Sequence, residues 1–324
     1  MTASWGELRE KRRVEGIDVV RGVVIFGVVS FHTAGSVDWW GVDELNTVFF
    51  FLSGLFFRPR TFRQELAKDV RTLLVPFFVF LVLSFAYRVG LYFCDNGSTA
   101  GFDWTVWRGI FNRQGNIDYM APNVALWFLL CLFWVKLEFN LLRRAPRGVV
   151  AAVLAAIWIL ADWIITLPLP FLISNSLYWL LYYAAGYYVG NWLLRIGDRK
   201  TLGMVMVACA AVYLAFRVVP HEAYPLPVVA VEYVCYSAMW LCVPLIWKGM
   251  RWPFMAYMGR NSLAVLCYHL FLLIPLGRVA ERLLGGDVGP WMAMAVSVVA
   301  FVALYPIIKL TLRYTPWAVG RLRG

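Results

Sequence analysis

Apolar runs of about twenty residues recur along the whole 324-residue chain, and this repetition limits the folds that it can adopt. Hydrophobic residues make up 61% of the sequence and charged residues only 15%. Soluble domains are about 45–50% apolar and about 25% charged. A helix that crosses a bilayer needs roughly 20 mainly apolar residues. We therefore predict an all-α, polytopic helical bundle embedded in a lipid bilayer.

Ten segments are apolar enough to be membrane spans, although the second of them is short. The connections between them are mostly brief, so we predict a single integral-membrane domain over residues 1–324. The longest connection, 93–121, is rich in Gly, Asn, Asp and Trp and is predicted to be an outer loop. The ten predicted spans are 17–35, 43–57, 72–92, 122–141, 149–167, 172–194, 202–219, 226–247, 261–279 and 291–312.

The basic residues predict the orientation of these spans, because cytoplasmic connections carry an excess of Lys and Arg. With the N-terminus inside, 22 of the 30 basic residues fall on the cytoplasmic side and six on or near the outer side. Both termini, segment 1–16 and tail 313–324, are then cytoplasmic, and we expect the cell (inner) membrane as the location. The net charge of +11 is explained by topology, so no nucleic-acid partner is implied.

Cysteine usage argues against a disulfide framework or a metal site. Five of the six cysteines lie inside apolar runs, and none forms a C-x-x-C pair. We interpret them as small apolar packing residues.

The first span holds three ionisable residues, Asp18, Arg21 and His32. Arg21 and His32 are eleven positions apart, which on a helix places them within about 20° of the same face and about 16 Å apart along the axis. Asp18 lies one turn before Arg21 and is predicted to pair with it. Burying a charge in a membrane costs at least about 2.5 kcal/mol, so this stripe indicates a functional site. The alternative without a functional role is that the Arg21 side chain snorkels to the membrane surface.

The second span and the basic run after it offer further candidates. Asn46 and Ser53 are seven residues apart and share a helix face, where packing alone is the competing interpretation. The run RPRTFRQELAKDVR (58–71) includes Lys68 and Arg71. It can be a topology signal, a site for anionic lipid headgroups, or a clamp for the phosphates of a cytoplasmic ligand.

Two later spans carry isolated ionisable groups. Ser262 and His269 are seven apart and share a face, with His269 near mid-membrane. Glu232 is a carboxylate inside the eighth span, which requires a partner or a function.

Four motifs together resemble the membrane-bound acyltransferase-3 family. They are IDVVRG (17–22) followed by His32, FFFLSG (49–54) followed by basic residues, VALWFLLCLF (124–133) and MGRNSLAVLCYH (258–269). The second and fourth resemble the branch related to fucose 4-O-acetylases. The resemblance implies about ten helices, an acyl-CoA donor, expected to be acetyl-CoA, and a glycan hydroxyl of the cell envelope or of an exported polysaccharide as acceptor.

The resemblance also implies roles for residues. Arg21 and His32 match the essential pair of the family, and Arg71 matches a basic position at the start of the third span. The coenzyme A nucleotide is expected on the cytoplasmic surface that includes Lys68 and Arg71, with its pantetheine arm passing Ser53 and Arg21 toward His32. His32 then acts either as general base or as transient acyl carrier.

The remaining residues are assigned to support and to acceptor binding. Asp18 is expected to hold Arg21, and either His269 or Glu232 to orient His32 or bind the sugar. The expected substrate-binding residues are His269, Glu232, Trp104, Trp107 and Asn46. The competing function is a transporter or channel for a small polar solute that uses the same stripe, which the absence of evident paired half-repeats disfavours.

Overall fold

The computed structural model describes residues 15–33, 35–37, 41–105, 123–217 and 225–321, and in these ranges every regular element is a helix. The all-α prediction is therefore confirmed. The longer helices are α2 (Glu15–Phe31), α3 (Val42–Leu55), α4 (Phe62–Asp69), α5 (Val75–Asn96), α6 (Trp127–Leu142), α7 (Arg147–Ile159), α9 (Ile173–Ala185), α11 (Arg199–Arg217), α12 (Leu226–Ile246), α13 (Pro253–Arg260), α14 (Ser262–Leu284) and α15 (Pro290–Tyr314). The short pieces are π-helix η1 (Val70–Leu74), η4 (Val124–Leu126), α8 (Ala161–Ile164), η5 (Pro170–Leu172), π-helix η6 (Gly186–Gly190), α10 (Asn191–Leu193) and η8 (Pro316–Val319).

Six helical stretches among the described residues are long and apolar enough to cross a membrane, which supports a multi-pass membrane protein. They correspond to six of the ten predicted spans. The other four predicted spans contain shorter or broken helices: α2 has 17 residues and α3 has 14. Helix α7 ends at Ile159, and α9 gives way to η6 after 13 residues. The six stretches are Phe62–Asn96, Val124–Leu142, Arg199–Arg217, Leu226–Ile246, Ser262–Leu284 and Pro290–Tyr314.

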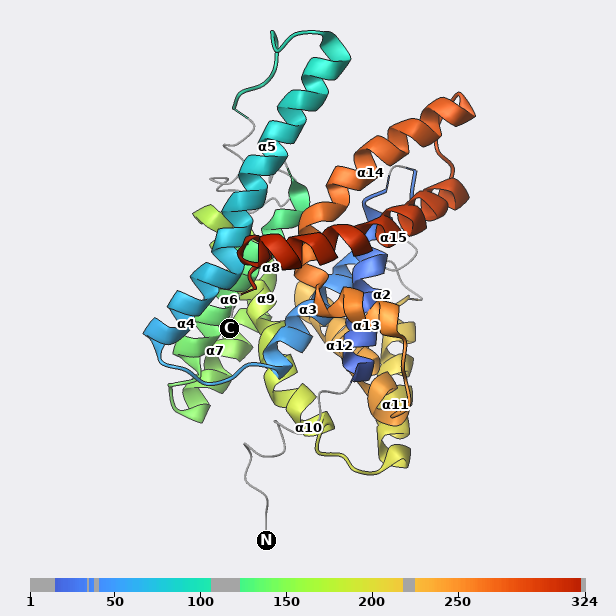
Figure 1. The fold of residues 1–324 in the computed structure, drawn as a ribbon. Coiled ribbons are helices and arrows are strands. Elements are labelled where there is room, and N and C mark those ends of the chain that lie inside the picture. Colours follow the sequence, from blue (N-terminus) through green and yellow to red (C-terminus); the bar gives the residue numbers. More distant parts are fainter. Residues whose placement is uncertain (1–14, 34, 38–40, 106–122, 218–224, 322–324) are drawn as a thin grey trace.

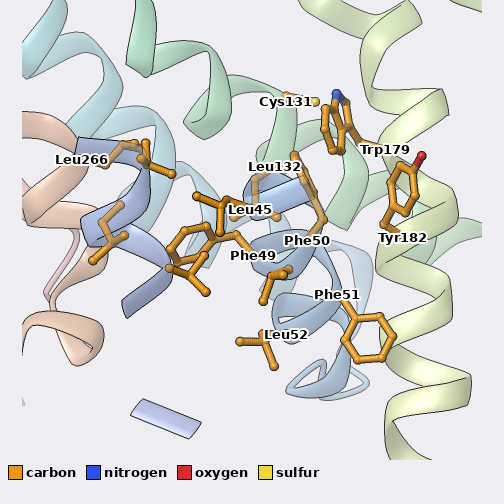
Figure 2. Packing of buried hydrophobic residues seen from close by; sticks show 14 of the residues in the cluster. Leu45, Phe49, Phe50, Phe51, Leu52, Cys131, Leu132, Trp179, Tyr182 and Leu266 are labelled. Atoms are coloured by element: carbon orange, nitrogen blue, oxygen red, sulfur yellow. The ribbon is translucent and has the colours of Figure 1, made fainter. Parts of the chain in front are cut away.

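Helix α3 lies at the centre of the molecule, with α2, α9, η6 and α12 packed around it (Figure 1). This helix has only 14 residues, and its apolar character comes largely from its phenylalanines. Two of them, Phe50 and Phe51, are fully buried. The Phe50 ring stacks on Trp179 of α9 with ring centroids 4.7 Å apart (Figure 2). The FFFLSG segment is therefore part of the core.

Two glycines permit the close approach of α3 and the α9–η6 segment. A Cβ added at Gly54 would overlap the carbonyl oxygen of Tyr183, and one at Gly186 would overlap that of Phe51. Small residues at such crossings allow helix backbones to touch within a membrane. The GYYVG segment therefore makes a contact inside the fold.

Helices α14 and α15 form a hairpin whose turn lies at the upper right of Figure 1, and the C-terminal half of α5 extends toward the top. The end of α2 is fixed to α15, since the hydroxyl oxygens of Thr33 and Ser297 lie 2.8 Å apart. Helix α5 is joined to α14 by the Tyr87 hydroxyl, which donates to the Phe271 carbonyl at 3.2 Å. The first of these links holds the residues that directly follow α2 against α15.

Candidate functional site

A glycine crossing brings Arg21 of α2 to the start of α14. A Cβ added at Gly22 would overlap the carbonyl oxygen of Met255, and one at Gly259 would overlap that of Asp18. The two backbones therefore touch where IDVVRG meets MGRNSL. In this position an Nη of Arg21 donates to the Ser262 hydroxyl at 3.4 Å.

An apolar cavity of about 520 Å³, partly open to solvent, lies beside Arg21; we call it the inner cavity. Its polar lining residues are Arg21, Asn46, Ser53 and Ser262. The sequence spacing correctly placed Asn46 and Ser53 on one face of α3. The apolar lining consists of Ile25, Val28, Phe49, Leu73, Phe128, Leu129, Leu132, Leu263 and Leu266.

A second, larger space of about 890 Å³ adjoins the inner cavity, and we call it the vestibule. Four residues line both spaces, so the two meet at this level: Arg21, Ser53, Leu73 and Leu132. Five cations and a single carboxylate are found among the described residues that line the vestibule. They are Arg21, Arg58, Arg60, Lys68, Lys136 and Glu65. This excess of positive charge favours an anionic ligand.

The basic loop at the rim of the vestibule is held over the end of α6. The Arg60 carbonyl accepts hydrogen bonds from the side chains of Asn140, Arg143 and Arg144 at 3.4, 3.4 and 3.5 Å. Thr61 then begins α4 with a capping box, in which its side chain and that of Gln64 each accept from the other's backbone N–H. The loop therefore holds exposed Arg58 and Arg60 at the mouth of the vestibule.

Two buried carboxylates balance part of this charge. Lys136 of α6 forms ion pairs with Asp69 and with Glu65, the latter at 3.2 Å. Lys68 pairs with Glu65 at 3.3 Å and keeps about a third of its side chain exposed. Lys136 is thus fixed within the protein, whereas Lys68 also faces solvent.

The imidazoles of His32 and His269 meet edge to face, with ring centroids 5.0 Å apart. The Nδ1 atom of His32 lies 2.8 Å from the Val28 carbonyl oxygen, and that of His269 lies 2.8 Å from the Leu266 carbonyl oxygen. A carbonyl only accepts, so each Nδ1 carries a proton, and the neutral form of each ring then has its lone pair at Nε2. His269 is fully buried, and its Nε2 has no hydrogen-bond partner among the described residues.

The inner cavity ends close to this histidine pair. Val28 and Leu266, whose carbonyls hold the two imidazoles, are themselves lining residues of the cavity. The structure thus aligns the vestibule, Arg21, the inner cavity and the His32–His269 pair in that order.

The other residues singled out in the sequence lie around or away from this line. Asp18 is buried and its carboxylate lies 3.7 Å from the guanidinium of Arg260. Arg71 is exposed and is not a lining residue of the vestibule or the inner cavity. Trp104 is 53% exposed and packs against Phe102 beyond the end of α5. Trp107 lies outside the described residues.

Glu232 is buried on a different side of α3. Its carboxylate lies 3.6 Å from Arg217, which also pairs with Glu44 of α3. Glu44 and Asn46 are two positions apart and point to nearly opposite faces of the helix. Glu232 is therefore part of an ion-pair cluster that ties α11 and α12 to α3, and it does not line the inner cavity.

Sequence reasoning gave Lys136 and Ser262 no role in the site. Lys136 was visible as a lone cation at the end of the apolar run VALWFLLCLFWVK. Its partners on α4 were not visible, because they are about seventy positions away in the chain. Ser262 was noted only for sharing a face with His269.

Comparison with known proteins yields one family match. A family model described as an acyltransferase domain matches residues 14–309, which include every residue that lines the vestibule and the inner cavity. No curated protein matches the chain, and no solved structure does.

Proposed function

Because the chain belongs to the acyltransferase-3 family, we propose that this membrane acyltransferase moves an acetyl group from acetyl-CoA to a hydroxyl of an envelope or exported glycan. The observation that carries the proposal is the continuous line from a basic vestibule, through an apolar cavity, toward two histidines. An acyl-CoA has a matching sequence of parts: an anionic nucleotide, a slender arm and a reactive thioester. Within the family we favour the branch related to fucose 4-O-acetylases.

The donor nucleotide binds in the vestibule, where Lys68, Arg58 and Arg60 offer solvent-facing cations to its phosphates. Arg71, exposed on the adjoining π-helix, contributes to the same field. The pantetheine arm passes Ser53 and Arg21, which line both spaces, and its thioester enters the inner cavity.

His32 acts as general base on the acceptor hydroxyl. Its Nδ1–H is donated to the Val28 carbonyl, which leaves the Nε2 lone pair to take the proton. His269 packs edge-on against His32 and orients its ring. The alternative in which His32 carries the acyl group transiently uses the same Nε2 atom as nucleophile.

The full arrangement has ten membrane segments, counting the shorter and broken helices, with both termini in the cytoplasm and the protein in the inner membrane. The distribution of basic residues supports this orientation. The vestibule then faces the cytoplasm, where acyl-CoA is made, and His32 lies toward the outer side, where the acceptor glycan is modified.

Labelled transfer tests this function directly. Membranes that contain the protein are given acetyl-CoA labelled in its acetyl group, and the label in the glycan fraction is measured. We expect label with the wild type and at least a 100-fold loss with His32→Ala at equal protein level, on the order of the general-base contribution. Unchanged transfer by His32→Ala would show that His32 is structural. Solute uptake by vesicles without acetyl-CoA would instead identify a transporter.

A further inference from the structure

The outer end of the inner cavity is marked by one polar side chain, that of Asn46. Helices α2 and α3 form an antiparallel hairpin, and Arg21 and Ser53 lie at one level because both line the vestibule and the cavity. Val28 is seven residues beyond Arg21, and Asn46 is seven residues before Ser53, a rise of about 10.5 Å in each case. Asn46 and Val28 therefore lie at the same level, at the end of the cavity farther from the vestibule. Val28 is one helical turn before His32.

Among the described polar residues that line the cavity, Asn46 is the one that neither lines the vestibule nor is bonded to another lining residue. Ser262 is bound to Arg21, and Arg21 and Ser53 lie where the cavity meets the vestibule. The carboxamide of Asn46 is half-buried and makes no hydrogen bond with any residue that the structure describes. An amide in an apolar cavity loses free energy unless it is hydrogen-bonded, so a carboxamide aimed at a cavity is characteristic of a ligand contact.

We propose that the Asn46 side-chain N–H is the hydrogen-bond donor that stabilises the oxyanion formed on the thioester during acyl transfer. This assignment rests on the proposed function and deepens it. It places the reacting carbonyl between Asn46 at the end of the cavity and Nε2 of His32 one turn beyond.

The step balances as follows. The acceptor hydroxyl oxygen forms a bond to the thioester carbonyl carbon, its proton goes to Nε2 of His32, and the carbonyl π electrons move to the oxygen that Asn46 contacts. The tetrahedral oxyanion then collapses and the carbon–sulfur bond breaks. The thiolate takes the proton back from His32, which leaves an ester and free coenzyme A. An amide donor held in an apolar cavity acts most strongly on this developing charge.

Asn46 serves the donor and not the glycan, because it lines the space that is continuous with the basic vestibule. The acceptor approaches His32, which is not among the lining residues of that space. Loss of the Asn46 donor should therefore slow the chemical step without weakening acetyl-CoA binding.

The experiment compares the wild type with Asn46→Leu and the isosteric Asn46→Asp, using acetyl-CoA as the probe. We expect kcat to fall about 10²–10³-fold in both variants, the effect typical of removing one oxyanion donor. The dissociation constant of acetyl-CoA should change less than threefold in Asn46→Leu, which also shows that this variant is folded. Asp43→Asn, an acid–amide exchange on the exposed first turn of α3, is the matched control and should retain wild-type activity.

A spectroscopic readout separates this role from simple packing. The infrared carbonyl band of bound acetyl-CoA, labelled with ¹³C at the thioester carbon, should lie at lower frequency in the wild type than in Asn46→Leu. If the wild type transfers acetyl groups and the kcat of Asn46→Leu is within threefold of the wild-type value, the role of Asn46 is wrong while the proposed function stands. An infrared band at the same frequency in both proteins would lead to the same conclusion. Absence of any transfer by the wild type would overturn the proposed function and this assignment together.

Discussion

Arg21 is the residue on which the two spaces of the site converge. Its guanidinium lines both the vestibule and the inner cavity and is held by Ser262. A lysine has a single charged ammonium group in place of the planar guanidinium fork. It therefore does not face both spaces while keeping the hydrogen bond to Ser262. We expect Arg21→Lys to lower kcat/KM for acetyl-CoA about 10–100-fold, measured by labelled transfer with protein level as control. Wild-type kinetics would rule out a role for the fork geometry.

Lys136 is the cation of the vestibule whose role is mainly structural. Replacing it by methionine leaves Asp69 and Glu65, which are almost fully buried, without their principal cation. Removing one partner of a buried ion pair typically costs about 3–5 kcal/mol. We therefore expect Lys136→Met to lower the thermal unfolding temperature of the detergent-solubilised protein, and addition of Asp69→Asn to restore part of the loss. An unchanged unfolding temperature in Lys136→Met would show that Lys68 alone balances the carboxylates.

At the scale of single residues, the sequence predicts which side chains share a face of one helix, because this depends only on their spacing. The common face of Asn46 and Ser53 follows from a seven-residue separation, and both line one cavity. Partners on other helices do not follow from spacing. The ion pairs of Glu232 with Arg217 and of Lys136 with Asp69 depend on how helices pack, so they emerge only from the fold.

At the scale of elements, the crossing of α2 with α13 positions the site. Gly259→Ala places a methyl group against the Asp18 carbonyl oxygen and should force the two helices apart. Gly203→Ala in α11 is the matched control, because a Cβ there meets open space and alanine favours a helix over glycine by roughly 0.5–1 kcal/mol. We expect Gly259→Ala to lose both thermal stability and acyl transfer, while Gly203→Ala keeps both. Equal behaviour of the two variants would contradict the close-contact interpretation.

The helix boundaries show where hydropathy stops being informative. A composition window detects that 149–167 and 172–194 are apolar, but it does not detect the break at Leu160 or the left-handed backbone of Phe171 and Leu172. It also does not detect the π-helical turn of η6. Six predicted spans coincide with long helical stretches, one of which, Phe62–Asn96, continues through the π-helix η1.

At the scale of the whole molecule, the fold places a basic vestibule at one end of the site and the partly exposed His32 beyond its other end. The short helices α2 and α3 are packed among other helices, and most of their residues are buried (Figure 1). The proposed function uses this arrangement to bring a donor and an acceptor together from opposite sides of a membrane.

The measurement that tests this account most directly compares sealed membrane vesicles of the two orientations, given labelled acetyl-CoA from outside. Acetyl-CoA does not cross the bilayer, so only vesicles that present the vestibule outward can use it. We predict transfer to glycan in inverted vesicles, none in right-side-out vesicles until they are permeabilised, and none in either with His32→Ala. Transfer by intact right-side-out vesicles, or by His32→Ala in inverted ones, would contradict the proposed route.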